Sequence, residues 1–182
     1  MRASWWDYAA GGWYFVTICT QHRLTLFGDV LPEDDRLIRL TPAGEMVSHC
    51  WRTLGTQFAF AAVDAFVVMP NHLHGIVAIR STVPPIPERT RAPDTRPNGT
   101  LAGSIGRIIQ AFKSETTVAY IRAVQHDGWE PVDGRLWQRG YHDHVIRDSA
   151  DLERVRSYIA ANPQRWLLDT LHPSNTTRSH ST

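Results

Sequence analysis

Short apolar runs rich in aromatic and β-branched residues alternate along the chain with longer amphipathic stretches. The apolar runs are bounded by turn residues, which is typical of strands. Strands are therefore expected over 13–20, 57–69, 73–80 and 136–146, the last with a bulge at Gly140. Apolar residues at helical spacing predict helices over 41–54, 103–124 and 149–162. The order β-α-β-β-α-β-α predicts an α+β protein, in which one antiparallel sheet carries helices mainly on one face.

The predicted helices carry start and stop signals. Thr41 followed by Pro42 is typical of an N-cap and a first helical residue, and Gly55 is expected to end that helix. Asp148 has the side chain of an N-cap for the last helix, and Pro163 ends that helix or begins its irregular last turn. The stretch between the first strand and the first helix, 21–39, is expected to hold at most a short extended segment.

Residues 81–99 differ in kind from the rest of the chain. They hold five of the eleven prolines, mixed with arginine, threonine and aspartate. Such a composition cannot bury a core and predicts an extended loop. Two interpretations stay open: an inert insertion, or a flap over nucleic acid that uses Arg89, Arg91 and Arg96.

Length and composition fit one domain in a reducing compartment. A chain of 182 residues can bury one sizeable core, which we place in 1–172, followed by a tail at 173–182 that is expected to be disordered. Two cysteines make neither a disulfide framework nor a cysteine zinc site. No apolar run is long enough to cross a bilayer, so a cytoplasmic protein without membrane contact is expected.

The charge balance alone does not identify a partner. The formal net charge is +1, which is no global signature of nucleic-acid binding. Lys113 is the only lysine, so nearly all basic side chains are arginines, which favour bidentate contacts to phosphate. A codon bias toward arginine would produce the same composition.

A pair of histidines follows the turn Pro70-Asn71, at the start of the strand predicted over 73–80. Residues two apart on a strand point to the same face, so His72 and His74 direct two imidazoles to one point. Neutral imidazole is the commonest metal ligand among side chains. The alternative is that both histidines merely bind backbone or water beside the turn.

A second group of polar side chains lies on the last predicted helix. Arg154, Tyr158 and Asn162 are spaced by four and share one helical face. They present a guanidinium for phosphate, a hydroxyl nucleophile and an amide oxygen that could complement the two histidines. The alternative is an amphipathic helix whose tyrosine packs at the core edge and whose asparagine caps the last turn.

The two groups together resemble a known family. Residues 70–74, Pro-Asn-His-Leu-His, resemble the His-hydrophobic-His (HUH) motif of single-tyrosine transposases. Residues 136–147 (LWQRGYHDHVIR) and 158–163 (YIAANP) resemble the branch of REP-associated tyrosine transposases. The resemblance runs in order from about Gly12 to Trp166, and the insertion at 81–99 interrupts it.

The resemblance implies a ferredoxin-like HUH nuclease fold and a role for each matching residue. His72 and His74 correspond to metal ligands, Asn162 to the third ligand, and Tyr158 to the catalytic nucleophile. His144 falls in the family's strand motif and is expected either to give structural support or to orient a residue that binds the metal. The divalent metal would be Mg²⁺ or Mn²⁺.

The function implied is cleavage and strand transfer of single-stranded DNA beside a hairpin of palindromic repeats, through a 5′-phosphotyrosine. The protein would be nucleoid-associated, and a monomer is favoured over a dimer. Two other interpretations stay open: a non-catalytic hairpin-binding module of the same fold, and a metal hydrolase of small substrates. The candidate DNA contacts are Arg107, Lys113, Arg139, Arg147, Arg154 and Arg165.

Overall fold

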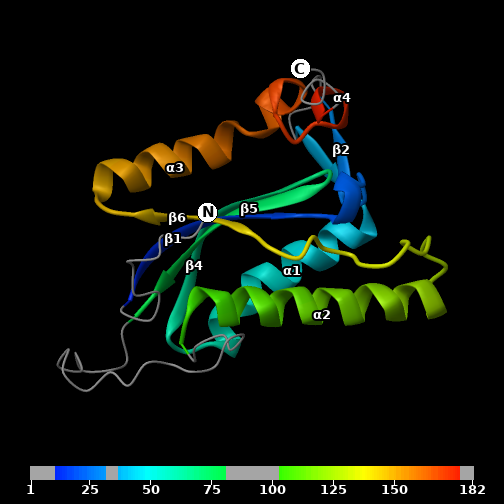
Figure 1. Ribbon diagram of the computed structural model, residues 1–182, viewed down its shortest axis with the longest axis horizontal. Coiled ribbons are helices and arrows are strands. Elements are labelled where there is room, and N and C mark those ends of the chain that lie inside the picture. The colour runs from blue at the N-terminus through cyan, green and yellow to red at the C-terminus, as the bar shows by residue number, and fades with distance from the viewer. Residues whose placement is uncertain (1–10, 32–36, 81–102, 177–182) are drawn as a thin grey trace.

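A computed structural model describes residues 11–31, 37–80 and 103–176 of the chain (Figure 1). The elements are β1 (Gly12–Cys19), η1 (Gln21–Arg23), β2 (Gly28–Val30), β3 (Ile38–Leu40), α1 (Pro42–Gln57), β4 (Ala61–Met69), β5 (His72–Ile79), α2 (Ile105–His126), β6 (His142–Ile146), α3 (Ser149–Ala161), η3 (Pro163–Leu168) and α4 (Pro173–Thr176). The predicted insertion at 81–99 lies outside the described residues. Among the described residues, no helix combines the length and apolar character that crossing a membrane requires.

The main sheet has the strand order β4-β5-β1-β6, with antiparallel pairing throughout. The α+β fold predicted from the strand and helix pattern is therefore confirmed. The stretch 21–39, which was not placed beyond a short extended segment, contributes both strands of a small separate sheet, β2 and β3.

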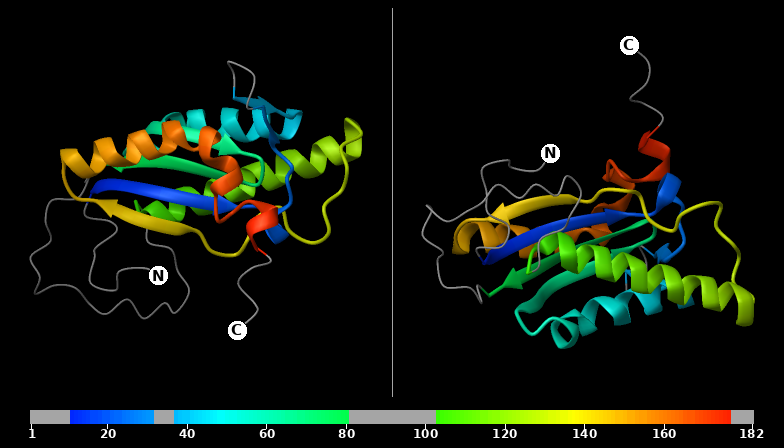
Figure 2. Two further views of the ribbon diagram at one scale, coloured as in Figure 1. Left: turned by 90° about the horizontal axis from the view of Figure 1, so that it is seen from above. Right: turned by 60° about the horizontal axis from the view of Figure 1, so that its bottom comes forward.

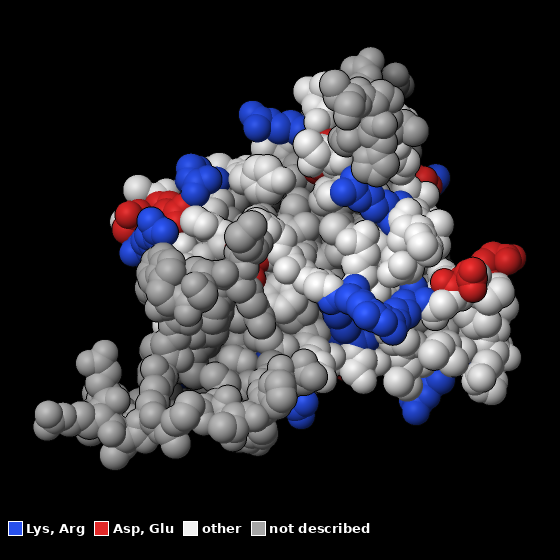
Figure 3. All heavy atoms as spheres, viewed as in Figure 1, with Lys and Arg blue, Asp and Glu red and all other residues white. Residues whose placement is uncertain are grey.

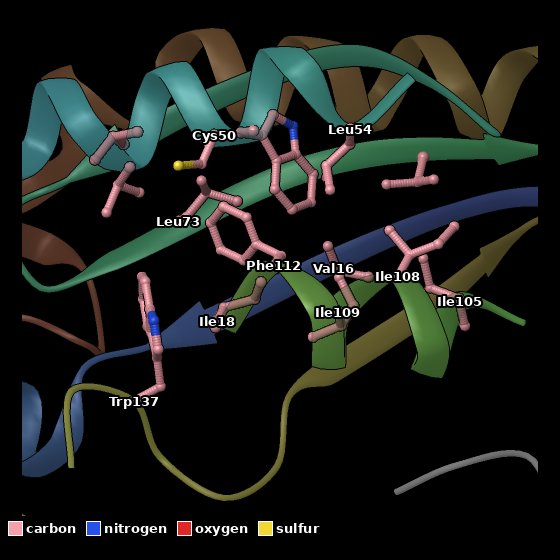
Figure 4. Packing of buried hydrophobic residues seen from close by; sticks show 14 of the residues in the cluster. Val16, Ile18, Cys50, Leu54, Leu73, Ile105, Ile108, Ile109, Phe112 and Trp137 are labelled. Carbon is pink, nitrogen blue, oxygen red and sulfur yellow. The ribbon is translucent and has the colours of Figure 1, made fainter. Parts of the chain in front are cut away.

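The two faces of the main sheet carry different helices (Figures 1 and 2). Alternation along β1 sends Tyr14, Val16 and Ile18 toward the larger core beneath α1 and α2. Figure 4 shows Leu73 of β5 and Phe112 of α2 meeting in that core. Helix α3 covers the opposite face, where Ile76, Ile146, Val155 and Ile159 form a second, smaller cluster. The expectation of helices mainly on one face thus describes α1 and α2, and α3 is the exception.

Several predicted boundaries are wrong by a few residues. Helix α1 continues past Gly55 to Gln57, because Leu54 is buried and its carbonyl accepts a bond from the Phe58 amide. Strand β4 consequently begins at Ala61 rather than at residue 57. Residues 136–138 make only an isolated bridge from Trp137 to Thr20, so regular pairing in β6 begins at His142.

The tail predicted to be disordered begins with a short helix, α4. The Asn175 side-chain amide donates to the carbonyls of Leu167 (3.0 Å) and Asp169 (2.9 Å), which ties this helix to the preceding segment. The remaining tail residues, 177–182, lie outside the described part of the chain.

Close packing beside His74 predicts that Gly75→Ala destabilises the fold. A Cβ at Gly75 would lie 2.4 Å from Cζ2 of the buried Trp51 ring. Overpacking of this kind costs about 1–3 kcal/mol, which urea unfolding would measure as a lower midpoint. Gly55→Ala is the matched control, since its nearest heavy atom is 3.5 Å away and alanine favours a helix by up to about 1 kcal/mol. Equal midpoints for the two variants would contradict the packing argument.

Candidate active site

The turn between β4 and β5 places the two histidines of the HUH-like motif side by side. Because the strand alternates, Leu73 enters the core under α1 and α2, while His72 and His74 face the α3 side of the sheet. Both imidazoles are buried, with exposed fractions of 0% and 2%. Their Nε2 atoms are 3.0 Å apart. Two ring nitrogens this close require either a shared proton or a cation between them.

Neighbouring side chains set the orientation of both rings. Nδ2 of Asn71 donates to the carbonyls of Leu171 (2.8 Å) and Arg23 (3.2 Å), so Oδ1 of Asn71 is the atom that accepts from His72 Nδ1 at 2.8 Å. His72 therefore carries its proton on Nδ1 and presents a lone pair at Nε2. The Thr17 hydroxyl lies 2.8 Å from His74 Nδ1 and fixes the orientation of the second ring, and a hydroxyl can either donate to this nitrogen or accept from it.

Burial keeps both imidazoles neutral. It lowers the pKa of His72 to about 2, with smaller contributions from His74 and Arg23. It lowers the pKa of His74 to about 3, with a smaller contribution from His142. Neutral imidazoles retain the lone pairs that bind metals, so both side chains are available as ligands at neutral pH.

Helix α3 brings Tyr158 over the histidine pair. Val155 and Ile159 anchor the helix on the sheet, which directs Tyr158 toward β5. The Tyr158 hydroxyl lies 3.4 Å from His74 Nε2, and its ring packs edge-on against Phe15. Burial raises the pKa of the phenol, as does the Asp169 carboxylate, whereas Asn162 and Arg165 lower it. The side chain remains 40% exposed and therefore accessible to a large substrate.

Asn162, the predicted third ligand, is the C-cap of α3 and is 2% exposed. Its Oδ1 is buried and has no hydrogen-bond partner among the described residues. Buried polar atoms are nearly always paired, so this oxygen is available to a group that the protein chain does not supply. An amide oxygen and two neutral imidazoles are donor types that divalent metals accept, and Asn162 lines a cavity together with Tyr158 and Asp169.

The structure adds Asp169, which the sequence patterns did not single out. Ligand atoms of His72, His74 and Asp169 all lie within 4.8 Å of one another and could hold a metal ion. Asp169 Oδ2 is 3.9 Å from His72 Nε2. Its sequence neighbours form no motif, and it reaches the site only because η3 folds the chain back after α3.

An open cavity of about 480 Å³ leads to these groups. Its lining includes His74, Tyr158, Asp169, Cys19, Gln138 and His142. A second recess, of about 500 Å³, shares Gln138 with the cavity and is lined also by Arg135, Arg139, Gln21, His22 and Asp133. Figure 3 shows basic side chains gathered on this face of the molecule, near the segment that connects α2 to β6.

The backbone between the cavity and the recess is held firmly. Lys113 of α2 donates to the carbonyls of Gln138 (2.8 Å) and Gly140 (2.5 Å), and burial lowers its pKa to about 8. Trp137 donates from Nε1 to the Thr116 hydroxyl at 2.8 Å. Lys113, predicted as a DNA contact, thus lies beside the site with its ammonium group bound to backbone.

The other predicted residues lie around this site in different settings. His144 Nε2 lies 2.8 Å from Asp151, which also pairs with Arg154, so these side chains join β6 to α3. Arg165 lines a further cavity, of about 450 Å³, beside Tyr158 and Asn162. The remaining candidates, Arg107, Arg139 and Arg147, are exposed on α2, beside the recess and after β6, respectively.

Comparison with known proteins places the chain in a family and gives its fold. No family model matches the sequence. A Haemophilus influenzae protein described only as uncharacterized is 32% identical over 178 residues, which cover 94% of this chain and 91% of that protein. The structure of a REP-associated tyrosine transposase bound to a REP hairpin matches with a TM-score of 0.56 and 20% identity, over 91% of this chain and 74% of that one. The chain therefore belongs to one family with the Haemophilus influenzae protein, and its fold is that of the REP-associated tyrosine transposase.

Proposed function

We propose that the protein is a metal-dependent endonuclease and strand transferase that cleaves single-stranded DNA beside hairpins. The observation that carries the proposal is the position of the Tyr158 hydroxyl, 3.4 Å from His74 Nε2 within one chain. A hydroxyl nucleophile beside paired buried imidazoles, which can hold a metal, is an arrangement that supports attack by tyrosine on a phosphate.

The proposed reaction is a transesterification. The Tyr158 oxygen attacks a backbone phosphorus, the bond from phosphorus to the 3′ oxygen breaks, and the 5′ phosphate stays on the tyrosine. The phenol must give up its proton, and its raised pKa makes the phenolate scarce at neutral pH. A strand with a free 3′ hydroxyl can reverse the step, so bond energy is kept for rejoining.

His72, His74 and Asn162 would hold the metal, for which we propose Mg²⁺ or Mn²⁺. When bound, the ion would polarise the scissile phosphate and stabilise charge on the leaving oxygen. Asn71 and Thr17 hold the two rings so that their Nε2 atoms converge. Because His74 contacts Tyr158 of its own chain, we propose that one monomer suffices for cleavage.

Hairpin binding is proposed from the matching transposase, whose structure contains a REP hairpin. The recess beside the cavity would receive the unpaired flank of such a hairpin. Arg135 and Arg139 make no ion pair among the described residues, and Gln138 lies at the junction with the Tyr158 cavity. Guanidinium groups suit phosphate, since they offer several donors in one plane.

Replacing both arginines, in an Arg135→Ala, Arg139→Ala variant, should lower the affinity for a flanked hairpin by about tenfold and reduce the salt dependence of binding. Fluorescence anisotropy with flanked and blunt hairpins would measure this. Arg122→Ala, an exposed position on α2 outside the recess, should bind both as wild type does. An equal loss on the blunt hairpin would count against the recess as the flank site.

The direct test is a denaturing gel. Protein is incubated with Mg²⁺ or Mn²⁺ and labelled single-stranded hairpins from the DNA that flanks its own gene. A labelled band at the mass of protein plus oligonucleotide, lost with EDTA, is the expected result. Hairpin binding without an adduct would favour the non-catalytic binding module instead.

A further inference from the structure

We propose that Asp169 is a metal ligand and that Asn71 positions it by locking residues 163–172 against the turn between β4 and β5. The proposal rests on the metal site of the proposed function, and it extends the donor set beyond His72, His74 and Asn162. The two elements of the proposal are a carboxylate facing the imidazoles and one amide that bonds to both parts of the site.

Asp169 is a largely covered carboxylate at the edge of the cavity, and it has no cationic partner among the described residues. Its side chain is 9% exposed, and no lysine or arginine pairs with it among the described residues. Oδ1 accepts from the Leu171 amide at 2.7 Å, which leaves Oδ2 facing His72 Nε2 at 3.9 Å. Because Nε2 of His72 carries a lone pair, it offers this oxygen no proton. A carboxylate oxygen that faces two neutral imidazoles from 9% exposure is stabilised by a cation placed among the three groups.

The spacing of the ligand atoms agrees with one ion. Metal bonds to imidazole nitrogen and carboxylate oxygen are about 2.1 Å long, so neighbouring ligand atoms around one ion lie about 3 Å apart. The two Nε2 atoms, 3.0 Å apart, match this spacing. Asp169 Oδ2, 3.9 Å from His72 Nε2, completes the set after a small inward shift of its side chain. Two imidazoles with one carboxylate suit Mn²⁺ better than Mg²⁺, which prefers an all-oxygen shell.

Asn71 connects this carboxylate to the histidine motif. Its side chain is fully buried, and one amide bonds to His72 through Oδ1 and to the Leu171 carbonyl through Nδ2. Arg23 adds a bond from Nη1 to the Thr170 carbonyl at 2.9 Å. Trp166, which is 7% exposed, packs its ring against those of His72 and His172. The segment that carries Asp169 is therefore held on both sides of that residue.

The test measures Mn²⁺ affinity by electron paramagnetic resonance and calorimetry, without DNA. Asp169→Asn should weaken Mn²⁺ binding by at least about tenfold, whereas Asp29→Asn, an exposed carboxylate on β2, should leave it unchanged. Unchanged affinity in Asp169→Asn would overturn the ligand assignment. Because no cleavage is measured, this result is separate from the fate of the proposed DNA chemistry.

Asn71→Asp separates positioning of the segment from orientation of His72. It keeps an oxygen for His72 Nδ1 but loses the donors to Leu171 and Arg23. A carboxylate that accepts from Nδ1 strengthens metal binding by an imidazole. Equal or tighter Mn²⁺ affinity would therefore contradict the proposal that Asn71 holds residues 163–172 in place. We expect about tenfold weaker affinity, no added loss in the double variant with Asp169→Asn, and faster amide exchange confined to 163–172. Arg23→Ala keeps the hydrogen bond between Asn71 and His72 and removes the bond to the Thr170 carbonyl, so it should speed exchange in the same segment if Asn71→Asp fails to fold.

Discussion

Tyr158→Phe should abolish the covalent adduct and reduce hairpin cleavage by at least a thousandfold, a loss of about 4 kcal/mol in transition-state stabilisation. The variant lacks only the oxygen that would form the phosphate ester. The phenyl ring keeps its contacts with Phe15 and His74, so the helix and the metal ligands should stay in place. The denaturing gel with labelled hairpins, run over a time course, would measure the loss.

The control for this prediction is a tyrosine remote from the site. Tyr120→Phe removes a hydroxyl that donates to the Glu130 carbonyl at the far end of α2, and it should form the adduct at the wild-type rate. Hairpin affinity should stay within a few fold of wild type in both variants. Cleavage by Tyr158→Phe at the wild-type rate would rule out the tyrosine nucleophile and favour hydrolysis by a metal-bound group.

The main elements of the fold were predictable because their signals are local. Alternation along β1 and β5 identifies which residues enter each core, and the caps Thr41 and Asp148 accept bonds from Gly44 and Asp151, as their positions suggested. The helix stop at Gly55 failed because packing of Leu54 outweighs the roughly 1 kcal/mol that glycine costs inside a helix. The helix propensity of single residues does not include the free energy of burying Leu54 in the core.

The candidate site was predictable only in part, for a related reason. The spacing of His72 with His74, and of Tyr158 with Asn162, is a local pattern that places each pair on one face of an element. Asp169 follows an irregular 3-10 turn and meets the histidines through contacts nearly a hundred residues apart in sequence. No periodic sequence pattern predicts that Asp169 lies beside His72 and His74.

The fold explains why a tyrosine on a helix can serve a metal site on a strand. Helix α3 is the only one of the three long described helices on its face of the sheet, where the apolar contacts of Val155 and Ile159 hold it against the strands. Arg156 strengthens that contact, because it bonds to Asp64 of β4 at 2.7 and 2.8 Å. The nucleophile and the imidazoles are thus held by two elements that pack directly against each other.

His74→Ala should remove metal-dependent cleavage as completely as Tyr158→Phe does, since His74 contacts both the imidazole of His72 and the hydroxyl of Tyr158. Loss of one imidazole ligand should also weaken Mn²⁺ binding by at least about tenfold, which calorimetry would detect without DNA. His126→Ala, at the exposed end of α2, is the control and should retain both properties.

Mixing the two inactive chains extends the His74 prediction to the oligomeric state. In the described chain Tyr158 reaches its own His74, so a mixture of His74→Ala and Tyr158→Phe proteins should stay inactive at every ratio. Restored cleavage would mean that a tyrosine from one chain serves the histidines of another. The adduct would then have to appear on the His74→Ala chain, which a mass difference between the two proteins would reveal. The contact between Tyr158 and His74 thus predicts an unrescued mixture and an active site that is completed within one chain.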